Sequence, residues 1–259
     1  MDTASRLARL SADISAPFRA EGFNARRLPV LVGEIDLSSL DAAPSCLDML
    51  VKLPGDTLTL PPPYDADPAI REAFRLLFET EDRVLSSWRE SRYLYLTVDR
   101  RFVEPGRTHR NAGWHFDGMQ GARYPVKLPV CHQYVVSSRN TTEFSDAPVD
   151  ATDLDEDRDN WFLAIGARVP DDAPVFRPEP GQLMLMSAYQ VHRSPVAEEP
   201  GWRTFVRIDV SLKQQDRLGN TPNPALPAPW VFVERRLPEG LGVPKASSGW
   251  EGASRFGQT

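Results

Sequence analysis

Cysteine is scarce in this sequence, since Cys46 and Cys131 are the only two among 259 residues. So few cysteines exclude a disulfide framework, and a reducing cytoplasm is the simplest compartment for the chain. Long apolar runs are also missing: no stretch approaches the ~18 residues that a membrane-spanning helix needs. The first residues lack the apolar core of a signal peptide. The sequence therefore predicts a cytoplasmic protein without a membrane segment.

An excess of positive charge is absent as well. The formal net charge is −6 and the pI is about 5.3, whereas a general nucleic-acid binder carries a basic patch and a high pI. Hydrophobic residues make up 41% and charged residues 25% of the chain, as is typical of a globular protein. The 24 prolines fit a loop-rich β fold better than a helical bundle. No linker or repeat divides the sequence, so we expect one domain over residues 1–259.

Histidine is rare too, with four in the chain, yet two of the four stand in an informative pattern. One residue separates His115 from Asp117, so on a strand both side chains point to the same face. His192 follows after a long gap and is expected to reach them from a neighbouring strand. Two histidines and one carboxylate that leave coordination positions open are typical of non-haem Fe(II) oxygenases. A His-x-Asp pair alone also fits an ordinary structural histidine, so the surrounding sequence has to decide between a metal ligand and a structural residue.

Two strands are predicted on either side of His192. Residues 180–187 start with a Pro-Gly turn and continue as an apolar run, which indicates a buried strand that delivers His192 at its far end. Residues 202–212 follow a second turn and are rich in aromatic and β-branched residues. We therefore expect two adjacent antiparallel strands that carry His192 and Arg203 side by side. The other expected elements are a short helix over 3–13, a helix that starts at an Asp-Pro cap over 67–78, and strands over 28–35, 92–103 and 128–138.

Together these motifs resemble the Fe(II)- and 2-oxoglutarate-dependent oxygenases. The resemblance covers roughly residues 92–212 and rests on Trp114-His115-Phe116-Asp117, Pro180-Gly181-Gln182-Leu183, His192-x-x-Pro195-Val196 and Gly201-x-Arg203. It implies a mainly β fold with flanking helices around a double-stranded β-helix core, also called a jelly roll, as in cupins.

The resemblance also implies a set of cofactors. Fe(II) is expected on His115, Asp117 and His192, with 2-oxoglutarate and O2 in the remaining coordination positions. Arg203 is expected to hold the far carboxylate of the oxo acid, because a planar guanidinium binds a carboxylate bidentately and keeps its charge.

Four further residues are candidates for contacts in the site. Gln133 and Thr142 lie in the region that faces the co-substrate in the family, so they are candidates for polar contacts to 2-oxoglutarate. Ordinary strand and turn chemistry explains them as well. Trp114 and Arg107 are candidate substrate contacts at the wall and the entrance. His132 is offset by one residue from Gln133, so it is expected on the opposite face of the strand.

A second arginine, Arg207, shares its strand face with Arg203. It either binds an anionic group of the substrate or pairs with a carboxylate such as Asp209 or Glu143, since structural ion pairs also place charges inside proteins. The sequence leaves these two roles open.

The predicted reaction is the hydroxylation of a small molecule, such as an amino acid or a natural-product intermediate, with release of succinate and CO2. Related halogenases replace the metal-binding carboxylate with a small residue, so Asp117 favours hydroxylation. Three alternatives remain: a peptide or protein side-chain hydroxylase, a cupin-like metal enzyme that does not use 2-oxoglutarate, and a non-enzymatic β-sandwich binding protein. The acidic segment 150–159 is either a solvated insertion or a lid, and residues 237–259 are expected to form a flexible tail.

Overall fold

A six-stranded antiparallel sheet is the largest element of the computed structural model, which describes residues 3–110, 112–117, 131–155, 159 and 161–233. The tail over 237–259, the centre of the acidic segment and residues 128–130 of an expected strand lie outside this part of the chain. From one edge to the other, the strands are β1 (Val30–Glu34), β7 (Gln182–Met186), β4 (Cys131–Ser137), β9 (Gly201–Ser211), β3 (Tyr93–Val103) and β2 (Cys46–Lys52).

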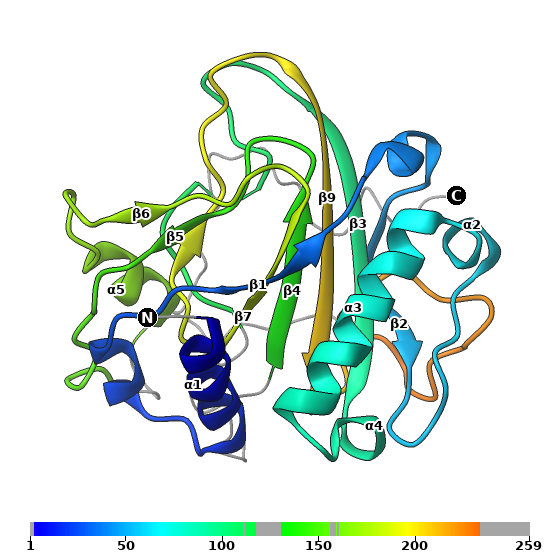
Figure 1. Ribbon diagram of the computed structural model, residues 1–259, viewed down its shortest axis with the longest axis horizontal. Coiled ribbons are helices and arrows are strands. Elements are labelled where there is room, and N and C mark those ends of the chain that lie inside the picture. Colours follow the sequence, from blue (N-terminus) through cyan, green and yellow to red (C-terminus); the bar gives the residue numbers. More distant parts are fainter. Residues whose placement is uncertain (1–2, 111, 118–130, 156–158, 160, 234–259) are drawn as a thin grey trace.

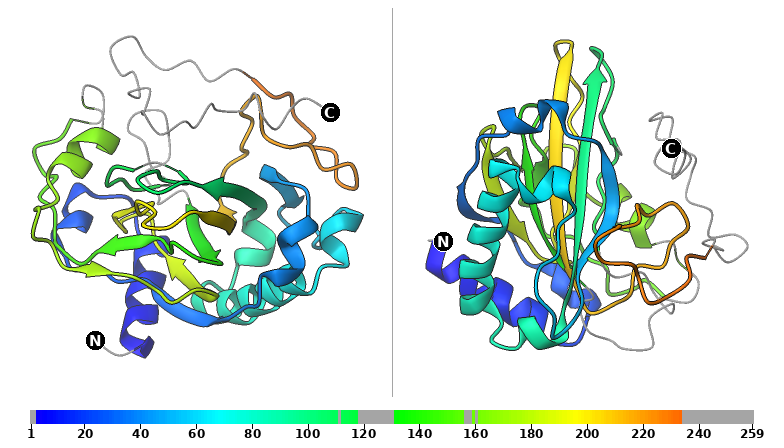
Figure 2. Two further views of the ribbon diagram at one scale, coloured as in Figure 1. Left: turned by 90° about the horizontal axis from the view of Figure 1, so that it is seen from above. Right: turned by 90° about the vertical axis from the view of Figure 1, so that its right-hand side faces the viewer.

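The two long helices, α1 (Thr3–Ser15) and α3 (Pro68–Val84), cover one face of this sheet, as Figures 1 and 2 show. Helix α3 (Pro68–Val84) begins where the sequence predicts, because the side chain of Asp67 accepts a hydrogen bond from Ile70 N at 3.0 Å. Within the described ranges, no helix is long and apolar enough to cross a membrane. The other helices are η1 (Ala20–Asn24), η2 (Ser38–Ala42), α2 (Pro62–Asp65), α4 (Trp88–Ser91) and α5 (Trp161–Ala167).

Alternation along the central strands separates two faces of the sheet. On β9, Val206, Ile208 and Val210 pack into the apolar core beneath the helices, while the residues between them face the other way. On this second face, which we call the inner face, lie the side chains of Arg203 and Arg207. The sheet therefore uses one face for its core and offers the other to a site.

A smaller three-stranded antiparallel sheet supplies the opposite wall of that site. Its order is β6 (Val175–Phe176), β5 (Glu143–Ser145) and β8 (His192–Arg193). The prediction of a mainly β fold with flanking helices is confirmed. The large sheet is open, and its edge strands are β1 and β2.

One expected strand pairing is wrong. Strand β7 ends at Met186, and a tight turn follows in which Gln190 N donates to Ser187 O at 3.1 Å. The chain thereby leaves the large sheet, and His192 pairs with Phe144 of β5 in the small sheet. His192 and Arg203 are consequently on different sheets rather than on adjacent strands.

Candidate metal centre

Two backbone hydrogen bonds bring His115 and His192 together. His115 N donates to His192 O at 2.9 Å, and His192 N donates to His115 O at 2.8 Å, which forms an isolated antiparallel bridge. Opposite residues of such a pair project to the same side, and the two ring centroids lie 4.4 Å apart. The sequence led us to expect His192 to reach His115 from a neighbouring strand, and the two residues meet here across this isolated bridge.

The orientation of both imidazole rings leaves one nitrogen of each free. Nδ1 of His115 lies 2.7 Å from Gly113 O, and Nδ1 of His192 lies 3.0 Å from Gln190 O. A carbonyl only accepts, so each Nδ1 carries the proton and each Nε2 presents a lone pair. Burial and the neighbouring His192 lower the pKa of His115 to about 4, so this ring is neutral at neutral pH, as a metal ligand must be.

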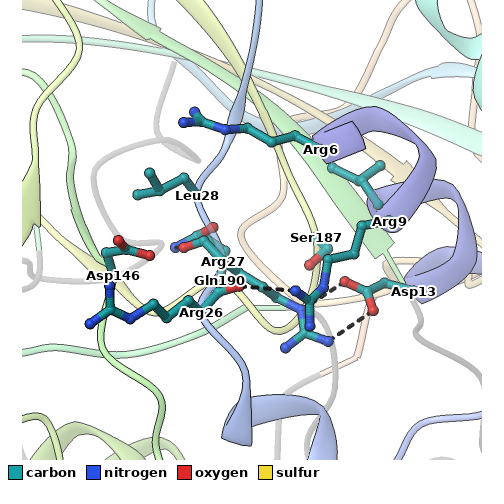
Figure 3. Close-up of a pocket in the computed structure, with 10 residues that line it drawn as sticks. Arg6, Arg9, Asp13, Arg26, Arg27, Leu28, Asp146, Ser187 and Gln190 are labelled. Atoms are coloured by element: carbon teal, nitrogen blue, oxygen red, sulfur yellow. Dashed lines mark hydrogen bonds and ion pairs between the residues drawn. The ribbon is translucent and has the colours of Figure 1, made fainter. Parts of the chain in front are cut away.

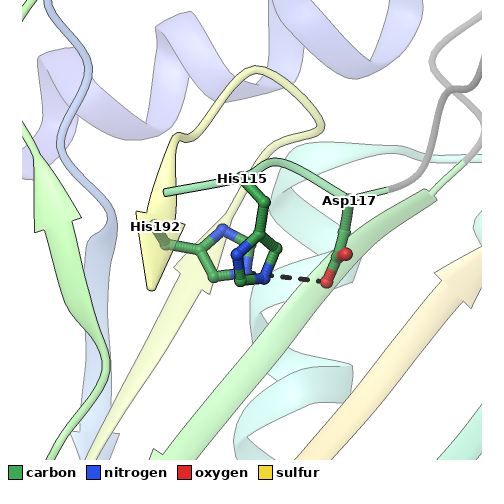
Figure 4. A group of neighbouring side chains, drawn as sticks. All are labelled: His115, Asp117 and His192. Carbon is green, nitrogen blue, oxygen red and sulfur yellow. Dashed lines mark ion pairs between the residues drawn. The ribbon is translucent and has the colours of Figure 1, made fainter. Parts of the chain in front are cut away.

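Asp117 completes a group of three side chains that point toward one another (Figure 4). One ligand atom from each of His115, Asp117 and His192 lies within 4.8 Å of the others. Asp117 Oδ2 is 3.6 Å from His192 Nε2 and 3.7 Å from Arg207 Nη1. Burial raises the pKa of Asp117, but the neighbouring His192 and the charge of Arg207 outweigh this effect, so the pKa lies well below its usual range. A carboxylate together with two imidazoles fits a divalent non-haem iron.

The three side chains open into a cavity between the two sheets. Both co-substrate candidates, Gln133 and Thr142, line it. The lining holds four guanidinium groups but a single carboxylate, that of Asp117, so the cavity attracts anions. The other lining residues are Arg110, Val135, Met186, Arg193, Ser194, Arg203, Phe205 and Arg207.

Arg203 is the most deeply buried of these arginines, with 1% of its surface exposed. It donates from Nε to Asn140 O at 2.9 Å, from Nη2 to Ser137 Oγ at 2.8 Å and from Nη1 to His109 Nδ1 at 2.9 Å. Burial and the charge of Arg110 lower the pKa of Arg203 to about 9, so it remains a cation at neutral pH. Among the described residues it forms no ion pair with a carboxylate, and an unpaired buried charge favours an anionic ligand.

Arg207, in contrast, is surrounded by carboxylates of the protein. Its Nη2 lies 2.5 Å from Asp48 Oδ1 and its Nε lies 3.0 Å from Asp209 Oδ2. Gln133 donates to the other oxygen of Asp209 at 2.5 Å. Asp48 sits at an irregularity of β2 with a φ of 45°, a backbone conformation that is strained for a non-glycine residue. This geometry corresponds to the ion-pair role that the sequence left open for Arg207.

The remaining candidates lie around the edge of the site. Glu143 pairs with Arg177 at 2.5 Å and with Arg193 at 2.6 Å, and not with Arg207. Arg193 also lies over the ring of Trp114, 4.2 Å from its centroid, so Trp114 supports a lining residue without lining the cavity itself. Arg107 is exposed and is also outside the described lining.

Sequence reasoning missed Asp48, Arg110 and Ser194 as residues of this site. The strand irregularity at Asp48 breaks the alternation that a periodicity argument uses. Arg110 and Ser194 lie outside the regular strands, where no periodicity exists. Proximity to the His-x-Asp motif was the one signal that could have pointed to Arg110.

A second cavity, of about 300 Å³, lies between α1 and the segment before β1 (Figure 3). Four arginines line it together with Asp13, which pairs with Arg27 at 2.8 Å. None of the three candidate metal ligands belongs to its lining. Gln190 links the two regions, because its side chain lines this cavity while its carbonyl contacts His192.

No protein-family model matches the chain, and no curated protein matches its sequence. Solved structures with a similar fold include AviO1 from Streptomyces viridochromogenes Tue57, at 16% identity and a TM-score of 0.36 over 79% of this chain and 96% of that one. An oxidoreductase of the 2OG-Fe(II) oxygenase family from Burkholderia pseudomallei is 13% identical, with a TM-score of 0.35 over 72% and 79% of the two chains. The non-haem monooxygenase ThoJ is 13% identical, with a TM-score of 0.34 over 92% and 82%. These values are too low to assign a function to the chain.

Proposed function

We propose that the chain is a non-haem Fe(II) oxygenase that uses 2-oxoglutarate and hydroxylates a small molecule. The observation that carries this proposal is the presence of two complementary features in one cavity. The first is the set of His115, Asp117 and His192, with both Nε2 atoms free. The second is the buried cation Arg203, which has no carboxylate partner among the described residues. A ligand with a chelating oxo-acid end and a far carboxylate matches both.

Each side chain has a defined task in this proposal. When iron, 2-oxoglutarate and O2 are bound, decarboxylation of the oxo acid supplies the oxidant that inserts one oxygen atom into a substrate C–H bond and leaves succinate. The two imidazoles hold the metal through lone pairs that the carbonyls of Gly113 and Gln190 orient. Asp117 contributes the negative charge, and Met186 and Phe205 form apolar parts of the cavity wall that exclude water.

The proposed substrate is a small molecule rather than a polymer, because the described cavity is small, about 90 Å³, and lies between two sheets. An amino acid or a natural-product intermediate fits this description. In the halogenases related to the family that the chain resembles, a small residue replaces the metal-binding carboxylate. Asp117 retains that carboxylate, so the proposed outcome is hydroxylation.

An anaerobic titration of the metal-free protein with Fe(II), with and without 2-oxoglutarate, tests the proposal. We expect a weak visible charge-transfer band only when both are present, and no band with the His192→Ala variant. Zn(II) is a matched control, because its filled d shell gives no such band. Metal binding without a band would instead support a metal enzyme that does not use the oxo acid. No metal binding at all would reduce the three side chains to structural residues.

A further inference from the structure

Arg110 is a second lining arginine whose bonding is incomplete. Its Nη1 atom is shielded from solvent and has no hydrogen-bond partner among the residues that the structure describes. Its ion pair with Asp99 Oδ2 is long, at 3.6 Å. A buried donor without an acceptor destabilises the folded protein, so the protein gains stability when an acceptor enters the cavity beside this atom.

Asp99 cannot neutralise Arg110 by itself, because other cationic and polar groups share it. Arg101 Nε lies 2.9 Å and His109 Nε2 lies 3.2 Å from the carboxylate of Asp99. The opposite nitrogen of His109 accepts from Arg203. Asp99 is thus the one carboxylate named here beside Arg101, Arg110 and, beyond His109, Arg203. This part of the cavity therefore carries an excess of positive charge.

Arg110 and Arg203 approach the same region of the cavity. Their Cζ atoms lie 5.0 Å and 5.1 Å from the centroid of the Phe205 ring. The charge of Arg110 is also one cause of the lowered pKa of Arg203. Two buried like charges repel each other unless an anion lies close to both.

The other two lining arginines differ from this pair. Asp48 and Asp209 surround Arg207, and Glu143 pairs with Arg193. Each of them thus has a carboxylate of the protein within 3.0 Å. The unsatisfied positive charge of the cavity is concentrated at Arg110 and Arg203.

We propose that Arg110 and Arg203 together bind the distal carboxylate of the oxo acid, and that Arg110 thereby helps select a dianionic oxo acid over a monoanionic one. This inference rests on the proposed function, and it adds a binding residue outside the sequence motifs that suggested that function. A guanidinium and a carboxylate form strong, charge-assisted hydrogen bonds, and Nη1 of Arg110 has a donor available for one.

The test is the dissociation constant of two oxo acids for the Fe(II)-loaded protein, measured anaerobically through the charge-transfer band. 2-Oxoglutarate carries the distal carboxylate, whereas 2-oxobutyrate has the same chelating end and lacks it. We expect Arg110→Met to raise the dissociation constant of 2-oxoglutarate about tenfold or more, as the loss of a charged hydrogen bond does. The dissociation constant of 2-oxobutyrate should change little. Arg110→Lys keeps the charge but lacks the planar guanidinium group, so 2-oxoglutarate affinity should fall less in this variant than in Arg110→Met.

A double-mutant cycle with Arg203→Met adds a second readout. If both arginines hold one carboxylate, the double variant should lose less 2-oxoglutarate affinity than the product of the two single losses. Arg177→Met is the control, because this exposed arginine lies outside the described cavity lining. Metal affinity and melting temperature of every variant show whether the site is still folded.

Each outcome bears on one of the two proposals. A band in the wild type with an unchanged 2-oxoglutarate affinity in Arg110→Met would overturn the role of Arg110 alone. Equal losses for both oxo acids would also overturn it, since the distal carboxylate would then not be what Arg110 recognises. Absence of a band from the wild type with either acid would overturn the proposed function itself.

Discussion

The two faces of the large sheet come from the same strands but have opposite chemistry. On the outer face, Val206, Ile208 and Val210 of β9 are nearly inaccessible and pack beneath the helices. On the inner face, Arg203 and Arg207 alternate with them and line the cavity. A single strand thus contributes to the core and to the candidate site at every second residue.

This difference shows how the fold supports buried charges. The outer face removes a large apolar surface from water, which is the main favourable contribution to folding. The inner face places Asp48 in a strained backbone conformation and Arg203 in an interior without a carboxylate partner among the described residues. Such features persist where the surrounding structure imposes them. If this division holds, changes on the inner face affect ligands and changes on the outer face affect stability.

Removal of a candidate metal ligand should have the largest effect. We expect His192→Ala to abolish oxygenase activity and to lower Fe(II) affinity by more than ~100-fold, because loss of a second-shell partner alone costs roughly 10–100-fold. The melting temperature of the metal-free protein should change little, since His192 contributes a ligand rather than core packing. Anaerobic calorimetry and circular dichroism measure the two quantities. Retention of full metal affinity would contradict the assignment of His192.

A substitution that creates a cavity in the outer face should have the opposite effect, a loss of stability without a loss of metal affinity. Ile208 is fully buried beneath α3, and Ile→Ala changes in a core cost about 2–5 kcal/mol. We expect urea unfolding of Ile208→Ala to show a loss of this size, while the folded variant binds Fe(II) with wild-type affinity at low temperature. A parallel loss of metal affinity would show that the two faces are not independent.

A polar cluster within the outer face provides a smaller test. Glu81 is fully buried, and its Oε1 lies 2.7 Å from His132 Nε2 and accepts from Tyr134 OH at 2.6 Å. Tyr134→Phe removes one of these two contacts, which should cost about 1–3 kcal/mol in the free energy of unfolding. Metal binding should remain unchanged, because the cluster lies on the far side of the sheet from the cavity. Urea unfolding with a parallel metal titration decides the point.

Local signals in the sequence predict much of this arrangement. Asp67 and the proline after it set the start of α3, and alternation on β9 assigns Arg203 and Arg207 to one face. The spacing of His115 and Asp117 indicates two ligands on one side. Each of these inferences depends on residues that are close in sequence. The start of α3 and the shared face of Arg203 and Arg207 have the expected geometry. The ligand atoms of His115 and Asp117 also lie close together, but on a segment that has an isolated bridge at His115 instead of a regular strand.

Long-range pairing explains what the sequence does not predict. Strand β8 has two residues, His192 and Arg193, which is too short to show a period, so its transfer to the small sheet has no local signal. The irregularity that aims Asp48 at Arg207 depends on how β2 pairs with β3. Arg110 lies outside the regular strands, and its environment is created by residues from β3 and β9.

The smallest expected effect concerns how stability depends on pH. It comes from His109, which lies on the inner side of the sheet. The ordinary pKa of a histidine is 6.5, and burial together with the charge of Arg203 lowers the pKa of His109 to about 4. Asp99 raises this pKa but only partly offsets the decrease. As the pH falls from 6.5 to 4, the unfolded chain binds a proton at this residue and the folded chain does not. The free energy of unfolding therefore decreases across this window and levels off below it.

His109→Gln is the matched variant for this effect, because a glutamine can accept from Arg203 and donate to Asp99 but does not titrate. We expect urea unfolding at pH 7 and pH 5 to show a smaller loss of stability for the variant than for the wild type. Other groups contribute equally in both proteins: the lowered pKa of His115 acts in the same direction, whereas burial raises the pKa of Asp209 to about 7, which acts in the opposite direction. Equal losses in the two proteins would show that His109 is protonated as readily in the folded protein as in the unfolded chain, and that the inner face around Arg203 is open to water.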